Sequence, residues 1–206
     1  MGVKTAEAVF EAVRRRRIPW CTFWASSYDN LLKRPRAERM VLNELFAAWF
    51  SRLAENPTVH REHVRVRVLG EWRELLADAA VQAMMRVREV TAEYQGPALT
   101  FLVGYDGDRE LVAATNVLLQ ARTGTPAGPV ALADLRAHAW TKELPDVDFL
   151  IRTGSWEDPH RSANFLPFLT SNVQESYPQL YWPDFSEEEL QRVIDDFAAR
   201  GRRLGA

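Results

Sequence analysis

Two arginines and a glycine occupy one short loop of the sequence, residues 152–165 (RTGSWEDPHRSANF). Arginine carries a planar, permanently charged guanidinium that can donate two parallel hydrogen bonds to a phosphate group. Gly154 has no side chain, so a ligand can approach the backbone closely there. Arg152 and Arg161 therefore predict a binding site for an anion, and a phosphate group suits their chemistry best.

The residues on either side of this loop predict the elements that must position it. Val147–Ile151 is a short apolar run, typical of a strand buried in a parallel sheet. Phe165 begins a second apolar stretch that is typical of a helix start, with Ser162 or Asn164 near the cap. Ligands of open α/β sheets bind beyond the carboxyl ends of the strands, where a helix start also offers free N–H groups. We therefore expect the loop to lie at such an edge.

The same loop also has a simpler interpretation. Glu157 and Asp158 lie between the two arginines in the sequence and would suit ion pairs with them in an ordinary surface loop. The sequence pattern by itself leaves the anion-binding and the surface-loop interpretations equally open.

Composition and motifs exclude several classes of function. The four histidines show no metal-ligand spacing with Cys21, and the chain has no HExxH, CxxC, GxSxG, Walker A or GxGxxG pattern. A net charge of -2 gives no general basic field for nucleic acid. A single cysteine excludes an internal disulfide framework, and no apolar run reaches the roughly 18 residues of a membrane span. We expect a cytoplasmic protein without a nucleic-acid partner.

Apolar runs alternate with helical patterns along the chain. Strands are expected at residues 20–25, 63–69, 98–103 and 147–151, and helices at residues 6–17, 35–53, 75–87, 108–120, 132–135 and 186–200. Thr123–Pro129 (TGTPAGP) is a Gly/Pro-rich connection. The alternation predicts an α/β fold: one domain over residues 1–206, with a mainly parallel central sheet flanked by helices.

Three stretches together resemble the cis-prenyltransferase family, to which undecaprenyl and decaprenyl diphosphate synthases belong. The segment ASSYDN with the following KRP is similar to the family's Phe-Ser-x-Glu-Asn-x-x-Arg-Pro segment, and LYWPDF is similar to its Leu-Trp-Pro-Asp-Phe ending. The third stretch, DFLIRTG followed by Glu157, Arg161 and Asn164, is similar to the family's Arg-x-Gly-x-Glu-x-Arg-x-Ser-Asn-Phe segment. The order of the three segments agrees along the whole chain.

The resemblance implies a reaction and assigns roles. Family enzymes condense isopentenyl diphosphate with an allylic prenyl diphosphate, use Mg²⁺, and act as dimers. The matching residues that would hold the diphosphate are Arg152, Gly154, Arg161 and Ser162, which lies beside the family's serine position; the matching catalytic residues are Asn30 and Arg34; a metal ligand would be Glu175, which adjoins Gln174 at the family's glutamate position. Partners would be a second copy or a homologue, with peripheral membrane contact through the product.

Departures from the family pattern leave alternatives. The sequence has no Asp-Gly-Asn-x-Arg segment, which in the family carries the catalytic aspartate. The favoured hypothesis is a cis-prenyltransferase enzyme. The alternative is a non-catalytic accessory subunit that lends its Arg-x-Gly loop to a catalytic partner, and a third hypothesis is a phosphate-binding module without prenyl chemistry.

Overall fold

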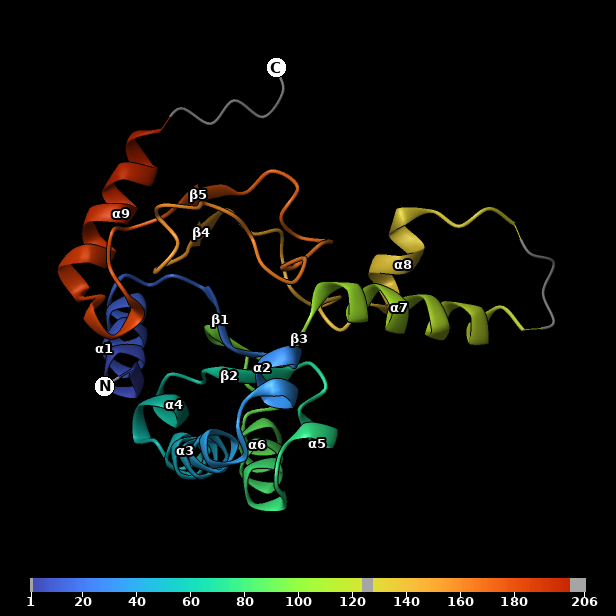
Figure 1. Cartoon of the computed structure of the whole chain (residues 1–206), viewed down its shortest axis with the longest axis horizontal. Helices are drawn as coiled ribbons and strands as arrows, with labels where there is room; N and C mark the ends of the chain where they lie inside the picture. The colour runs from blue at the N-terminus through green and yellow to red at the C-terminus, as the bar shows by residue number, and fades with distance from the viewer. Residues whose placement is uncertain (1, 124–127, 201–206) are drawn as a thin grey trace. The chain divides into compact units, whose positions relative to one another are not determined.

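The computed structural model describes residues 2–123 and 128–200 (Figure 1). Its internal contacts divide the chain into two compact units. One unit comprises residues 17–140, and the other combines residues 2–16 with residues 141–200. The interpretation of residues 1–206 as one cis-prenyltransferase-like domain stays a prediction.

The unit of residues 17–140 contains a three-stranded parallel sheet. Its strands are β1 (Trp20–Ser27), β2 (Arg65–Leu69) and β3 (Ala98–Tyr105), in the order β1-β3-β2. All 8 residues of the central strand β3 are buried, as expected for a strand with neighbours on both edges and side chains on both faces. The carboxyl ends of three parallel strands therefore meet at one edge of this sheet.

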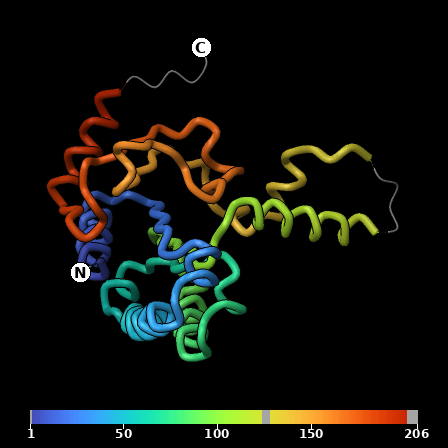
Figure 2. Tube along the Cα trace, viewed as in Figure 1, coloured from blue at the N-terminus to red at the C-terminus, as the bar shows by residue number. Residues whose placement is uncertain are grey.

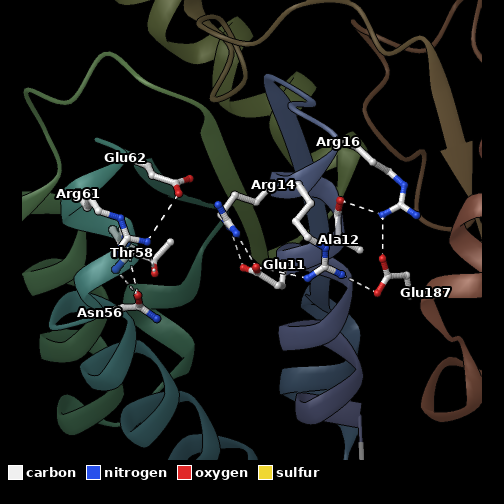
Figure 3. A network of polar contacts seen from close by, with 11 residues as sticks. Glu11, Ala12, Arg14, Arg16, Asn56, Thr58, Arg61, Glu62 and Glu187 are labelled. Atoms are coloured by element: carbon white, nitrogen blue, oxygen red, sulfur yellow. Dashed lines mark hydrogen bonds and ion pairs between the residues drawn. The ribbon is translucent and has the colours of Figure 1, made fainter.

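Seven described helices surround the sheet or extend from it: α2 (Tyr28–Lys33), α3 (Arg36–Ala54), α4 (Pro57–Arg61), α5 (Trp72–Leu75), α6 (Asp78–Val90), α7 (Gly107–Ala121) and α8 (Leu132–His138). Helices α3 and α6 pack against each other on one side of the sheet (Figure 1). Asn56 caps α4, since its side-chain oxygen accepts a hydrogen bond from the backbone N–H of Thr58 at 2.8 Å (Figure 3).

Aromatic rings fill the space between α3 and the sheet. Phe101 on β3 meets Trp49 and Phe50 of α3 in edge-to-face contacts, with ring centroids 4.9 and 5.2 Å apart. Phe23 on β1, the register partner of Phe101, joins them with centroids 6.4 Å apart. The helical spacing of the apolar residues in α3 thus places this helix on the sheet face that carries the phenylalanines.

Helices α7 and α8 form a hairpin, which the Cα trace follows clearly (Figure 2). Arg122, just after α7, donates to the Asp134 carboxylate of α8 at 2.7 Å, and this pair fixes α8 beside α7. The predicted Gly/Pro-rich connection Thr123–Pro129 lies mostly outside the described residues, since residues 124–127 are not among them.

The second unit contains α1 (Gly2–Arg15), β4 (Phe149–Ile151), β5 (Gln174–Ser176), a 3-10 turn η1 (Trp182–Asp184) and α9 (Glu187–Ala199). Its core joins α1 to α9 through Val9, Ala12, Phe185, Leu190 and Val193. Arg16 reaches the carboxylate of Glu187 on α9 at 3.2 Å (Figure 3). The predicted cap of α9 is confirmed, because the Ser186 hydroxyl accepts from the Glu189 N–H at 3.2 Å.

The α/β fold class with parallel strands flanked by helices is confirmed, but some details of the prediction are wrong. The strand at Phe149–Ile151 pairs in parallel with Gln174–Ser176 in a separate two-stranded sheet. The helix expected from Phe165 is absent, and residues 162–172 form turns. Pro167 explains this, because a proline disfavours the helical conformation at the residue before it, and Leu166 has a left-handed φ of 52°.

Within residues 2–123 and 128–200, no helix is both long enough and apolar enough to cross a lipid bilayer.

We predict that Gly70→Ala destabilises the sheet unit. Gly70 has a φ of 112°, and an added Cβ would lie 2.3 Å from the backbone oxygen of Val103. Strained backbone of this kind costs about 1–3 kcal/mol, and the collision with backbone adds to it. Urea denaturation measures the loss, with Gly128→Ala as the control, because nothing lies within 4 Å of its added Cβ. Equal free energies of unfolding for both variants would contradict the prediction.

Candidate functional site

Five of the predicted site residues belong to the unit that contains β4 and β5: Arg152, Gly154, Arg161, Ser162 and Glu175. The other two, Asn30 and Arg34, belong to the unit of the three-stranded sheet. The contacts of these two sets of residues are therefore given separately for each unit.

Arg152 is the first residue after β4, so the strand fixes the start of the loop. Its backbone N–H donates to the Ser176 carbonyl at 2.9 Å, which extends the β4–β5 pairing by one residue. Its guanidinium Nη1 donates to the carbonyl of His160, and its Nη2 lies 3.4 Å from Nε2 of the same histidine. The guanidinium is therefore directed at the far side of the loop.

Gly154 forms the tight turn after Arg152. Its φ is 71°, a left-handed value that favours glycine, and its N–H donates to the Leu180 carbonyl at 2.8 Å. An added Cβ would lie 3.2 Å from the ring of Tyr181, which also meets Trp156 edge to face with centroids 5.2 Å apart. The glycine thus lets the loop lie against Tyr181, and its predicted role beside the diphosphate stays a prediction.

Arg161 is held from two sides. Its Nε lies 2.9 Å from a carboxylate oxygen of Glu175 on β5, and its Nη1 donates to the hydroxyl of Thr170 at 2.7 Å and to the Thr170 carbonyl at 3.2 Å. The second carboxylate oxygen of Glu175 accepts a hydrogen bond from the Tyr177 hydroxyl. The Nη2 of Arg161 has no hydrogen-bond partner within residues 2–123 and 128–200, so it can serve a ligand.

These contacts bear on the expected Mg²⁺. Both carboxylate oxygens of Glu175 are already engaged, one by Arg161 and one by Tyr177. No group of three or more His, Cys, Asp or Glu side chains suited to a metal ion occurs in the described part of the chain. This donor set does not fit a magnesium ion held by protein ligands, which needs accessible oxygens. The metal role of Glu175 stays a prediction that its contacts do not support.

Tyr177 follows β5 and its hydroxyl donates to the Glu175 carboxylate. Burial, followed by the hydrogen bond to Glu175, raises the pKa of Tyr177 to about 12, while the charges of Arg152 and Arg161 act in the opposite direction. Neither arginine pairs with Glu157 or Asp158 in the described structure, which removes the particular ion pairs of the surface-loop interpretation.

His160 was not singled out from the sequence. Its Nε2 lies 3.4 Å from Nη2 of Arg152 and 3.3 Å from the hydroxyl of Ser162, so it stands between two predicted diphosphate ligands. A histidine inside a loop gives no periodic signal and has no motif spacing to another histidine. The only signal was its place between the two arginines.

In the other unit, Asn30 and Arg34 lie on and just after α2, beyond the carboxyl end of β1. The N–H of Asn30 donates to the hydroxyl of Ser27 at 3.1 Å, which is the cap of α2, and the Asn30 side chain is exposed. The guanidinium of Arg34 pairs with Glu38 at 3.3 Å, and both side chains are exposed. The polar residues Ser26–Asn30 favour a loop from the sequence alone, whereas Tyr28–Lys33 is helical.

A second residue missed in the sequence, Arg109, joins the loops that follow all three strands. It pairs with Glu71 after β2, with Nη2 3.0 Å from the carboxylate, and its guanidinium lies 3.7 Å from the ring centroid of Tyr28 after β1. The hydrogen bond to Glu71 raises the pKa of Arg109. Glu71 follows Gly70 at the end of β2, and Tyr28 follows β1 directly. Such positions at the carboxyl edge of a parallel sheet could have been noted.

The loop of residues 152–162 offers guanidinium N–H groups, a serine hydroxyl and an imidazole within one short segment. Charge-assisted hydrogen bonds from such groups are the usual means by which proteins hold phosphate. The arrangement is chemically suited to a diphosphate group.

We predict that the stability of the protein falls between pH 10 and pH 12 because of Tyr177. Its phenol stays protonated in the folded protein up to about pH 12, whereas the unfolded chain loses that proton around the ordinary value of 10.0. The unfolded state therefore binds fewer protons in this window, and the free energy of unfolding declines as pH rises. Tyr177→Phe should show a shallower decline in urea denaturation across this range. Tyr181→Phe, at an exposed tyrosine, is the control and should keep the steeper one.

Comparison with known proteins now identifies the family. The family model described as "Putative undecaprenyl diphosphate synthase" matches residues 1–205. The chain is 32% identical to an isoprenyl transferase of Thermus thermophilus, over 99% of this chain and 78% of that protein.

Two solved structures share the fold. A probable undecaprenyl diphosphate synthase from Campylobacter jejuni superposes with a TM-score of 0.80 at 23% identity, over 100% of this chain and 92% of that one. Lavandulyl diphosphate synthase from Lavandula x intermedia, in complex with dimethylallyl diphosphate, gives a TM-score of 0.89 at 20% identity, over 100% and 86%. The matches in sequence and in fold both extend over nearly the whole chain, and the chain therefore belongs to the undecaprenyl diphosphate synthase family of prenyltransferases.

Proposed function

We propose that this chain is a cis-prenyltransferase that condenses isopentenyl diphosphate with an allylic prenyl diphosphate to form a polyprenyl diphosphate. Such a reaction requires the protein to hold two diphosphate groups, each carrying several negative charges. The family match over residues 1–205 supports the reaction class. The isoprenyl transferase of Thermus thermophilus supports it through its sequence identity of 32%.

The observation that carries the proposal is that Arg152 and Arg161 both contact β5: the Arg152 N–H donates to the Ser176 carbonyl at 2.9 Å, and Nε of Arg161 lies 2.9 Å from a carboxylate oxygen of Glu175. Two cations in one loop can neutralise part of the charge of a diphosphate. Arg152 approaches from the end of β4, and Arg161 is oriented by Glu175 with its Nη2 left for the ligand. In this proposal Ser162 adds a hydroxyl donor, and the left-handed turn at Gly154 lets the loop fold back on itself.

The roles of Asn30 and Arg34 in catalysis are proposed from the family segment alone. Asn30 presents an exposed amide beyond the carboxyl end of β1, the edge at which ligands of parallel sheets bind. Arg34 would have to exchange its exposed ion pair with Glu38 for a substrate phosphate, and exposed pairs of this kind cost roughly 0–1 kcal/mol to break.

A requirement for Mg²⁺ in the reaction is expected from the family. Dialysis against EDTA followed by readdition of Mg²⁺ tests it through both binding of isopentenyl diphosphate and product formation.

The accessory-subunit function is the second candidate, and one observation favours it. The described residues contain no acidic cluster suited to a metal ion, and Glu175 is engaged by Arg161 and Tyr177. In this version the chain would form a heterodimer with a catalytic homologue and contribute Arg152 and Gly154 to the shared site. In the enzyme version, a homodimer is the proposed assembly.

We predict that Arg152→Ala weakens binding of isopentenyl diphosphate by about 2 kcal/mol, roughly 30-fold, the scale of a lost charge-assisted hydrogen bond. Isothermal titration calorimetry measures the dissociation constant directly. Arg192→Ala is the matched control, because Arg192 lies on α9, is half exposed and, among the described residues, pairs with Glu189 and Asp196 alone. Unchanged affinity in Arg152→Ala would remove Arg152 from the binding site.

We also predict that the purified chain alone forms a polyprenyl diphosphate from farnesyl diphosphate and labelled isopentenyl diphosphate. Thin-layer chromatography of the labelled products provides the measurement, with Arg161→Ala as an inactive comparison. Product only after addition of a catalytic homologue would favour the accessory subunit. If the chain binds neither isopentenyl diphosphate nor farnesyl diphosphate, both the enzyme function and the accessory-subunit function are contradicted.

A further inference from the structure

Arg109 contacts two loops outside its own helix. It lies in the first turn of α7, where its backbone N–H donates to the Asp106 carboxylate at 3.2 Å as part of the helix cap. Its Nη2 lies 3.0 Å from a carboxylate oxygen of Glu71, and its guanidinium carbon lies 3.7 Å from the ring centroid of Tyr28. One side chain at the end of β3 therefore contacts the loops that follow β1 and β2.

The place of Arg109 in α7 makes these contacts informative. The helix dipole has its positive end at the N-terminus, so a positive charge in the first turn does not favour the helix itself. The favourable contacts of the guanidinium lie instead in other elements, namely the ion pair with Glu71 and the cation–π contact with Tyr28. Its role is therefore best sought in the loops that it joins.

Glu71 is a fixed anchor for the guanidinium. It follows β2, and its backbone N–H donates to the Gly104 carbonyl of β3 at 3.2 Å. Its two carboxylate oxygens accept from Nε and Nη2 of Arg109, one oxygen for each nitrogen. A two-point pair of this kind fixes the plane of a guanidinium. The sheet thus orients Arg109 through Glu71, and Arg109 can in turn hold Tyr28.

Tyr28 is the first residue of α2, the helix that carries Asn30 and precedes Arg34. We propose that Arg109 is a positioning residue for α2, because it holds Tyr28 and so keeps Asn30 and Arg34 beyond the carboxyl end of β1. This inference rests on the proposed function, in which Asn30 and Arg34 take part in catalysis. Arg109 acts through these residues and needs no contact with the substrate itself.

The structure of α2 explains why such a contact matters. The helix has only 6 residues, and helices shorter than about 12 residues have little stability of their own. Leu31 is its buried residue, and the Ser27 hydroxyl accepts from the Asn30 N–H at 3.1 Å. The Asn30 side chain makes no hydrogen bond within residues 2–123 and 128–200, so its position depends on how firmly α2 is held.

Amide hydrogen exchange of the full chain, followed by mass spectrometry, tests the contact without measuring activity. In Arg109→Gln, peptides covering residues 28–34 should exchange about tenfold faster than in wild type, because α2 opens more easily. Arg122→Gln is the matched control, since Arg122 follows the other end of α7 and pairs with Asp134 at 2.7 Å. Equal exchange of α2 in wild type and Arg109→Gln would overturn the proposal.

Two variants of Tyr28 test the ring contact separately. Tyr28→Phe keeps the aromatic face beside the guanidinium and should match wild type in both exchange and activity. Tyr28→Leu removes that face and should reproduce the effects of Arg109→Gln. If Tyr28→Leu behaves as wild type in both measurements, Tyr28 does not transmit the position of Arg109 to α2, and the proposal is wrong.

Kinetics with farnesyl diphosphate and isopentenyl diphosphate test the link to Asn30, with a catalytic homologue added if the chain requires one. Arg109→Gln should lower kcat about tenfold, within the roughly 100-fold that a 1 Å misplacement can cost. Its dissociation constant for isopentenyl diphosphate, measured by calorimetry, should stay unchanged. In the Asn30→Ala background, Arg109→Gln should have almost no further effect on kcat, because the positioned side chain is already absent.

The outcomes separate this inference from the proposed function. If wild type forms product and Arg109→Gln lowers kcat by the same factor with and without Asn30, Arg109 has a general structural role and the inference fails, while the proposed function stands. If wild type forms no product, alone or with a catalytic homologue, the proposed function fails and this inference fails with it.

Discussion

The ion pair between Arg161 and Glu175 is the interaction on which the proposed site depends. It joins the loop after β4 to the neighbouring strand β5, and its side chains are only 38% and 23% exposed. Partial shielding from water strengthens such a pair relative to one on the open surface. Glu175 is itself held by Tyr177, so the guanidinium of Arg161 is oriented before any ligand arrives. Orientation in advance lowers the entropic cost of binding.

The strands and long helices could be predicted from the sequence because their signals are local. Apolar runs identified β1 and β3, alternation of valine with arginine identified β2, and helical spacing of apolar residues identified α3, α6 and α9. A polar loop was expected at Ser26–Asn30 because of its polar residues, but Tyr28–Lys33 forms a short helix that Ser27 caps. The pairing of β4 with the three-residue strand β5 depends on contacts between distant segments, which no local pattern encodes.

The proposed site could be predicted in part. Arg152 and Arg161 were recognisable as candidates because guanidiniums beside a glycine turn, after a predicted buried strand, suit an anion, although an ordinary surface loop fitted the sequence equally well. The partners of these arginines were not recognisable. Glu175 reaches Arg161 only because β5 lies beside β4, and Arg109 reaches Glu71 across 38 positions of the sequence. Such pairs follow from strand register and order, which become known only with the fold.

The left-handed backbone of the turn after Arg161 limits how this part of the protein can change during evolution. Ala163, Asn164 and Leu166 have φ values of 48°, 43° and 52°. Branched side chains such as valine, isoleucine and threonine are disfavoured in this conformation, whereas asparagine and glycine tolerate it. Substitutions at these three positions should therefore mainly introduce small residues or residues with amide side chains. New ligand specificity would arise more readily from changes at residues 155–160, where the chain has no left-handed residue.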